Sequence, residues 1–378
     1  MVERFVHNVS APPELRVDVH AAPALELLIG LSTLCGARAE TDGWVPELSQ
    51  CSAALNKAVA DLGPRSGELW LHLLGLALEL PAANAAAFAD AVAGFNGLEL
   101  RRHLVGVYVP SWRQVAGADT LEGAARGDAH AAGALLTNDR YYAGKAKDAL
   151  TLLLPLSPAS TRRRIVEVLR RFAAEVFGPV EQRLVAELAA EAEAKRALAA
   201  RVGPTALLAA AAKGFTYKPE PEASRVVLVP HQAARPWLLL CQHRDLRIIC
   251  YPAPDEREEQ ALDNQVLRLG RAIADPARVQ ILRRLADREA SLTELAELTG
   301  LAKSTAHHHL GQLRAAGLVT VSGNARAYRY ALAGGAPEEL SLLIARFLGR
   351  REPPTPLPAR RLRQAAPRKR AEADVIPR

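Results

Sequence analysis

The chain has 378 residues, a formal net charge of +7 and 49% hydrophobic residues, so it is long enough for two or three domains with their own cores. No apolar run reaches the length of about 18 residues that a membrane-spanning helix needs, and residues 1–10 lack the features of a signal peptide. The four cysteines include no C-x-x-C pair, which is typical of reduced thiols. We therefore expect a cytoplasmic protein without a membrane partner.

The basic charge is concentrated toward the C-terminus. Residues 263–378 contain 20 basic and 11 acidic side chains, a net charge of +9, whereas residues 1–262 contain 28 basic and 30 acidic side chains. A local excess of Lys and Arg is the electrostatic signature of a module that binds nucleic acid. The charge distribution therefore favours a nucleic-acid partner for the C-terminal part.

Residues 1–252 are predicted to form one region that is rich in helix. Segments 3–9 and 14–19 have strand-like sequences, separated by two prolines. From residue 24 to about 213 the apolar residues recur with helical spacing, whereas the Gly- and Asp-rich stretch 107–143 has no clear pattern. Helices are predicted at 23–35, 46–62, 66–80, 84–95, 97–106, 144–154, 160–177, 179–201 and 204–213.

Three short segments rich in Val, Leu and Ile follow the helical region, at 225–229, 237–242 and 246–251. Prolines and polar residues separate them, which predicts a small antiparallel sheet near 225–251 that closes the N-terminal region. Residues 253–262 then form a charged junction. The predicted fold class is mainly α with small β elements.

Two helices joined by a tight turn are predicted after the junction. Ser291 and Glu294 have the spacing of a capping box, which begins a helix that runs to about residue 298. Gly300 supplies the permissive backbone that the turn requires. The second helix is predicted from Lys303 to Ala316, with a buried stripe formed by Ala306, Leu310 and Leu313.

A β-hairpin is predicted directly after the second helix. Gly317 has the position of a left-handed helix cap. Segments 318–321 and 326–332 then alternate as strands around Ser322-Gly323-Asn324, which reads as a turn. Two helices, a hairpin and a preceding helix at 275–285 together describe a winged helix-turn-helix domain over 263–350.

This stretch resembles the winged helix-turn-helix of ArsR-type bacterial repressors. The resemblance rests on the D-P-x-R-x-x-I-L-x-x-L pattern of residues 275–285, and on residues 304–310 and 313–319, which are similar to the recognition helix of the family and its exit. It covers less than a quarter of the chain. It implies a sequence-specific transcriptional regulator of double-stranded DNA, expected here to be a repressor that forms a homodimer through the helices near 261–273 and 338–348.

The candidate DNA contacts lie on the exposed face of the second helix and on the wing. Lys303, at the helix start, suits guanine, and the side chains near it reach base edges in the major groove. Thr305 and Arg314 are predicted to hold phosphates. Ala302 departs from the family pattern, because a capping Ser or Thr normally stands there. The predicted contacts are Lys303, Ser304, Thr305, His307, His308, Gln312, Arg314, Arg326 and Arg329.

Metal regulation is not expected. ArsR relatives that sense metals often carry paired cysteines on the first helix of the motif, and segment 292–298 has none. The helix at 338–348 has no Asp/His ligand set. Residues 307–309 are all histidines, but consecutive helical side chains point about 100° apart, so they cannot converge on one ion. We expect no metal and no other cofactor, with packing as the role of His309.

Residues 1–252 are expected to be a regulatory domain, a dimerisation domain or both, and regulation is expected to enter there by a small organic effector or a protein partner. Trp44, Trp70 and Trp112 are candidates to enclose an apolar cavity, and the alternative is a helical scaffold without a ligand site. The sequence has no nucleophile elbow, Walker loop, H-E-x-x-H or dinucleotide fingerprint, so we expect no enzyme activity. The other function class left open is an enzyme or scaffold that its winged helix recruits to nucleic acid. Residues 351–378 are predicted to be a disordered basic tail.

Overall fold

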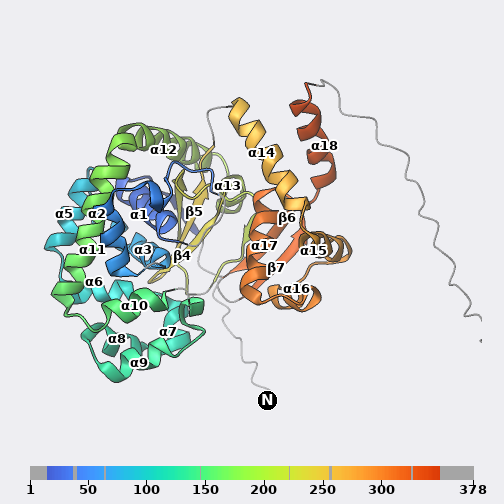
Figure 1. The fold of residues 1–378 in the computed structure, drawn as a ribbon. Helices are drawn as coiled ribbons and strands as arrows, with labels where there is room; N and C mark the ends of the chain where they lie inside the picture. The colour runs from blue at the N-terminus through green and yellow to red at the C-terminus, as the bar shows by residue number, and fades with distance from the viewer. Residues whose placement is uncertain are drawn as a thin grey trace, which may run out of the picture.

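A computed structural model describes residues 15–36, 41–63, 65–144, 146–220, 222–254, 258–324 and 327–349. Layers of helices surround one face of a central sheet, and the C-terminal winged helix lies on the other side of the molecule (Figure 1). The predicted fold class, mainly α with a few strands, is confirmed. None of the described helices is both long and apolar enough to cross a bilayer. The predicted strand at 3–9 and the tail at 351–378 lie outside the described residues.

The helices of the N-terminal region occur close to their predicted positions. Segment 66–80 is divided at Leu73 into two helices, and the helix predicted at 46–62 begins only at Ala53. The stretch 107–143, which no pattern assigned, contains three short α-helices. The helices are α1 (Pro23–Leu34), α2 (Ala53–Leu62), α3 (Gly67–His72), α4 (Leu74–Glu79), α5 (Ala85–Gly94), α6 (Gly97–Leu104), α7 (Pro110–Ala116), α8 (Ala118–Arg126), α9 (Ala129–Leu136), α10 (Lys147–Leu153), α11 (Pro158–Phe172), α12 (Gly178–Ala199) and α13 (Pro204–Ala211).

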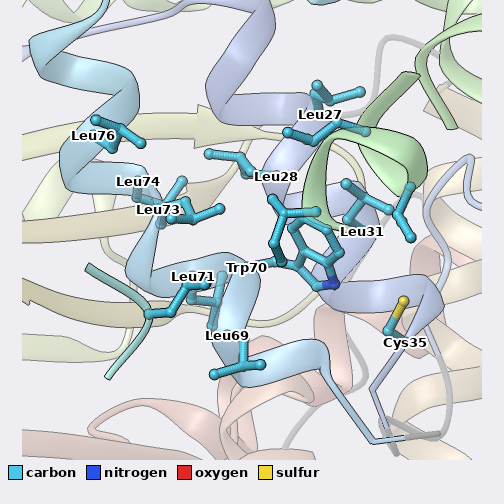
Figure 2. Close-up of a cluster of buried hydrophobic side chains, with 14 of the residues drawn as sticks. Leu27, Leu28, Leu31, Cys35, Leu69, Trp70, Leu71, Leu73, Leu74 and Leu76 are labelled. Carbon is cyan, nitrogen blue, oxygen red and sulfur yellow. The ribbon is translucent and has the colours of Figure 1, made fainter. Parts of the chain in front are cut away.

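Helix α1 is the centre of the first hydrophobic core. Its leucines are buried on every side, because α3, α4 and α5 and the central sheet all pack against it. The indole ring of Trp70 on α3 is fully buried and points toward Leu28 and Leu31 of α1 (Figure 2). A helix that is apolar all round belongs in the middle of a domain, and α1 occupies that place.

The central sheet has the strand order β1-β3-β5-β4, with β1 (Arg16–Val19), β3 (Arg225–His231), β5 (Leu246–Pro252) and β4 (Leu239–His243). The prediction of an antiparallel sheet is right only for β4 and β5. Strand β3 pairs in parallel with both β1 and β5. After its first residue, β3 is buried throughout. A strand covered on both faces has a continuous apolar run instead of an alternating one, which is typical of parallel pairing.

The two faces of the central sheet belong to two different cores. Val227 and Val229 of β3 face the core around α1. Val226 and Leu228 face a second core, which also contains Leu310 of the winged helix. The N-terminal region and the winged helix are therefore packed together through a shared hydrophobic core.

The winged-helix elements follow the sequence prediction closely. They are α14 (Glu258–Ile273), α15 (Pro276–Asp287), α16 (Leu292–Thr299), α17 (Lys303–Ala315), β6 (Val319–Asn324), β7 (Ala327–Leu332) and α18 (Ala336–Phe347). The capping box of Ser291 and Glu294 and the left-handed Gly300 and Gly317 are all confirmed. The hairpin turn is misplaced in the prediction, because Ser322 and Gly323 are paired strand residues and β6 continues to residue 324.

A third strand of the wing comes from the N-terminal region. Strand β2 (Phe215–Tyr217) pairs in parallel with β6, and Phe215 lies opposite Val321. Two flanking hydrogen bonds, from Val321 N to Gly214 O and from Lys218 N to Gly323 O, extend the contact at 2.9 Å each. This strand could not be predicted from the sequence, because three residues are too few for a periodic pattern. It covers the outer edge of the wing, which would otherwise present unpaired backbone groups.

Candidate nucleic-acid interface

Helix α17 has one buried face and one polar face, as the sequence predicts. Ala306, Leu310 and Leu313 are buried in the core of the winged helix. Ala302 provides no side-chain cap, so the first backbone amides of α17 lack the side-chain oxygen that a capping residue normally offers. The exposed side chains at this end of the helix are Lys303, Ser304, Thr305 and His307.

Arg278, the arginine of the D-P-x-R pattern, fixes α17 to the helices before it. Its Nε donates to the carbonyl oxygen of Ala272 at 2.8 Å, and its Nη1 contacts His309 Nδ1 at 3.2 Å and the side-chain oxygen of Gln312. His309 is therefore a packing residue, as predicted. Gln312 also lies 3.1 Å from His308 Nε2, so it links the structural side of α17 to its polar side.

The wing arginine that the structure describes is bound within the domain. Arg329 forms ion pairs with Glu294 at 3.0 Å and with Glu289 at 3.3 Å. The backbone amide of Ser291 donates to the Glu294 carboxylate, and together with the nearby arginines it lowers the pKa of Glu294 to about 2. Arg329 thus supports the capping box of α16. Arg326, the other predicted wing contact, lies outside the described residues.

The polar face of α17 is turned toward the N-terminal region. Trp237, in the loop between β3 and β4, stacks on the ring of His308 with centroids 6.2 Å apart and an interplanar angle of 29°. The same indole covers Gly311 so closely that a Cβ atom at this glycine would lie 2.4 Å from Trp237 Cζ3. Only a glycine allows this approach. Sequence reasoning missed Trp237, because nothing in its local sequence indicates contact with a helix 70 residues later.

A cleft of about 550 Å³ lies between α17 and the N-terminal region. One wall is formed by α17 and the wing, with Ser304, His307 and Arg314 among its residues. The opposite wall is formed by the end of α1 and by the starts of α3 and β4. Most of the residues predicted to contact DNA on α17 therefore share one cleft, and part of that face is covered.

Arg314 is another of the predicted contacts that line this cleft. Its side chain is partly buried beside Tyr330 of the wing and the backbone of Gly214. Burial lowers the pKa of Arg314 to about 10. No carboxylate among the described residues forms an ion pair with it. An arginine in this state is a good site for an anion, because pairing would offset the cost of burying its charge.

The three tryptophans proposed from the sequence do not line this cleft. Trp70 is a core residue, and Trp44 packs on α11 and donates from Nε1 to Glu26 at 2.7 Å. Trp112 stacks on Tyr142 with centroids 5.2 Å apart. The fourth tryptophan, Trp237, is the one at the cleft. Within the described ranges, no group of three or more His, Cys, Asp or Glu side chains could hold a metal ion.

Comparison with known proteins identifies the C-terminal region. Residues 273–322 match the family model described as a helix-turn-helix domain. Over 71 residues the chain is 44% identical to the HTH-type transcriptional regulators CmtR of Mycobacterium tuberculosis and Mycobacterium bovis, a match that covers 19% of this chain. The chain spans 60% of the length of these curated relatives.

Solved structures match the same part of the chain. One is the homodimeric winged helix-turn-helix DNA-binding domain of a possible ArsR-family transcriptional regulator from Mycobacterium bovis, 32% identical, with 26% of this chain and 90% of that chain covered and a TM-score of 0.21. Another is NolR from Sinorhizobium fredii, 26% identical, with 26% of this chain and 97% of that chain covered and a TM-score of 0.20.

Proposed function

Because the C-terminal region of this chain is an ArsR-like winged helix-turn-helix domain, we propose that the protein is a sequence-specific DNA-binding transcriptional regulator, and specifically a repressor. The observation that carries this proposal is the polar face of α17, which displays Lys303, Ser304 and His307 opposite a fully buried stripe. A helix of this design at the end of a helix-turn-helix reads base edges in the major groove. An enzyme activity is not needed to account for any part of this face.

The contacts divide into two kinds. Lys303, Ser304, His307 and His308 are proposed to reach base edges, because they lie at the N-terminal end of the polar face. Thr305, Gln312, Arg314, Arg326 and Arg329 are proposed to hold the sugar-phosphate backbone. We expect Arg329 to contribute less than Arg326, because its guanidinium is already paired with Glu289 and Glu294.

The active species is proposed to be a homodimer formed through α14 and α18. These two helices pack side by side at one end of the winged helix (Figure 1). They leave an apolar surface exposed that is typical of a protein interface. Its members are Leu267, Ile273, Leu342, Ile344, Phe347 and Leu348. A symmetric dimer would read an inverted repeat with half-sites about 10 bp apart.

Duplex DNA cannot reach the middle of the polar face of α17 in the arrangement that the structure describes, because Trp237 covers His308 and Gly311. The cleft has a volume of about 550 Å³, which suits a small molecule. It cannot hold a double helix, which is wider than its major groove of about 12 Å. We propose that this arrangement is the DNA-free form of the regulator. Binding of DNA would then require the N-terminal region to move off the polar face.

Fluorescence anisotropy with the full chain tests the proposed function. Labelled duplexes from the region upstream of the gene should bind more tightly than random duplexes. Affinity should fall steeply with salt, with a log–log slope of about −0.9 for each phosphate neutralised. Equal affinity for both kinds of duplex would contradict the claim of specificity.

A further inference from the structure

The cleft between α17 and the N-terminal region has the properties of a small-molecule site. Its volume of about 550 Å³ falls within the range of about 300–1,000 Å³ that is usual for pockets of drug-sized ligands. Trp237, Leu240 and Tyr328 supply apolar and aromatic surface, and Ser304 and Thr305 supply hydroxyl groups. The position between two parts of the chain is also one where such sites commonly occur.

The charges that line the cleft favour an anion. Two arginines, Arg65 and Arg314, and one carboxylate, that of Glu68, are among the residues that line the cleft. Arg314 is the more informative of the two arginines, because it is partly buried and has no acidic partner among the described residues. A guanidinium offers five donors in a planar fork that matches a carboxylate. Tyr330, whose hydroxyl interacts with Arg314 electrostatically, has a pKa raised by burial and cannot neutralise it at neutral pH.

We propose that this cleft binds an organic anion with an aromatic or apolar body. The acidic group pairs with Arg314, and the body lies against Trp237 and Leu240. Such a molecule touches both walls of the cleft, so it holds α17 against the N-terminal region.

This site would link the ligand to DNA by direct competition, a consequence that rests on the proposed function. His307, His308 and Ser304 line the cleft and are also the proposed base contacts. A ligand that occupies the cleft therefore uses the surface that DNA needs. Because it binds only the covered form, it shifts the population toward that form by its difference in affinity for the two forms.

Isothermal titration of the full chain with naproxen, an aromatic carboxylate, tests the site in the absence of DNA. The neutral primary amide of naproxen is the matched probe. We expect saturable binding of naproxen, and binding of the amide that is weaker by about tenfold or more, as expected for loss of a bidentate charged pair. Arg314→Gln should weaken the binding of naproxen by a similar factor and abolish the preference for the acid over the amide.

Two further variants test the site without changing Arg314. Leu240→Trp adds a bulky side chain to the cleft at a residue that is exposed in this structure. It should weaken the binding of naproxen and of its amide without disturbing the fold. Arg163→Gln changes an exposed arginine on α11 that donates a hydrogen bond to Ser160, and it should leave both affinities unchanged. Equal binding of acid and amide, full binding by Arg314→Gln or Leu240→Trp, or no saturable binding at all would each overturn the proposal.

An anisotropy competition then separates this inference from the proposed function. Naproxen should release a bound operator duplex from the wild-type chain but not from Arg314→Gln. A chain that binds naproxen and no DNA would support the cleft and contradict the proposed function. Naproxen binding that leaves DNA affinity unchanged would overturn the competition.

Discussion

The indole ring of Trp237 stacks on the imidazole ring of His308, and its edge fills the space left by the missing side chain of Gly311. One aromatic residue of the N-terminal region therefore covers the middle of the helix that we propose reads DNA. The shared core below it and the strand pairing of β2 with β6 hold the two parts together. The contact of Trp237 with α17 is specific, and its loss should have measurable consequences.

Trp237→Ala should increase affinity for operator DNA. Loss of the stacking contact destabilises the covered form by about 0.5–1.5 kcal/mol or more, which corresponds to an increase in affinity of about two- to tenfold if the covered form predominates. Fluorescence anisotropy gives the affinity, and hydrogen exchange of the α17 amides reports the uncovering directly. Trp237→Phe keeps an aromatic ring over His308 and should show the smaller effect. Unchanged affinity and exchange in Trp237→Ala would show that the contact does not restrain α17.

Gly311→Ala should act through the same contact. A methyl group at this position would lie 2.4 Å from the Trp237 ring, so the ring must move away and the covered form is destabilised. The same mutation stabilises the helix itself, because Ala is favoured over Gly by about 1 kcal/mol in a helix. The two mutations should therefore be non-additive: Gly311→Ala raises DNA affinity in the wild type and has little effect in Trp237→Ala. Additive effects would place Gly311 outside this contact.

The winged helix could be predicted in detail because its signals are local. The capping box of Ser291, the left-handed Gly317 and the buried stripe of α17 each depend on residues within a few positions of one another. The pairing of β3 with β1 and β5 could not be predicted, because it joins segments that are far apart along the chain. The sign of parallel pairing in the sequence is the continuous apolar run of β3, from Val226 to Val229.

The candidate site was predictable only in part, for the same reason. The residues of α17 follow from helical periodicity, which gives the polar face without saying what lies opposite it. Trp237, β2 and the partly buried state of Arg314 depend on how the N-terminal region packs on the winged helix. The prediction of a ligand cavity near Trp44, Trp70 and Trp112 placed it among core residues, since aromatic spacing alone does not distinguish a pocket wall from a packed interior.

Lys303→Ala should weaken DNA binding at particular base pairs and leave stability unchanged. Lys303 is exposed at the start of α17, so its removal disturbs no packing. Loss of a base contact costs about 1–3 kcal/mol at the base pairs concerned, whereas loss of a phosphate contact weakens all sequences alike. Competition with a set of single-base operator variants separates the two. The control is Lys57→Ala on α2, which removes an exposed lysine paired with Asp61 and should not alter DNA binding.

Glu26 should make the stability of the fold depend on pH. Burial raises the pKa of Glu26 to about 7, although Trp44 and the backbone amides of Gln232 and Ala233 donate hydrogen bonds to its carboxylate. The folded protein therefore binds a proton that the unfolded chain, with an ordinary pKa near 4.5, has already released. This contribution to stability is fully present below pH 4.5 and is lost as the pH rises to about 7.

The measurement is the free energy of unfolding by urea at several pH values between 4.5 and 8. The difference between wild type and Glu26→Gln should change by at most about 1.4 kcal/mol per pH unit in this window, and should be constant above it. His72 and His103 act in the opposite direction, because burial lowers the pKa of each to about 4. Their effect is common to both proteins and cancels in the difference. A difference that does not vary with pH would show that Glu26 ionises normally in the fold.

Phe347→Glu should convert the proposed dimer into a monomer. Phe347 at the end of α18 and Leu348 directly after it are 46% and 60% exposed, and Leu267 on the adjacent α14 is 55% exposed. Burial of such side chains in a dimer stabilises it by about 25 cal/mol for each Å² of apolar surface removed from water, and a carboxylate in the same place must be desolvated without a partner. Light scattering should give a dimer mass for the wild type and a monomer mass for Phe347→Glu. Leu298→Glu is the matched control, because Leu298 is equally apolar and 47% exposed but lies on α16; this variant should remain a dimer. A monomer mass for the wild type at micromolar concentration, with or without operator DNA, would contradict the proposed assembly.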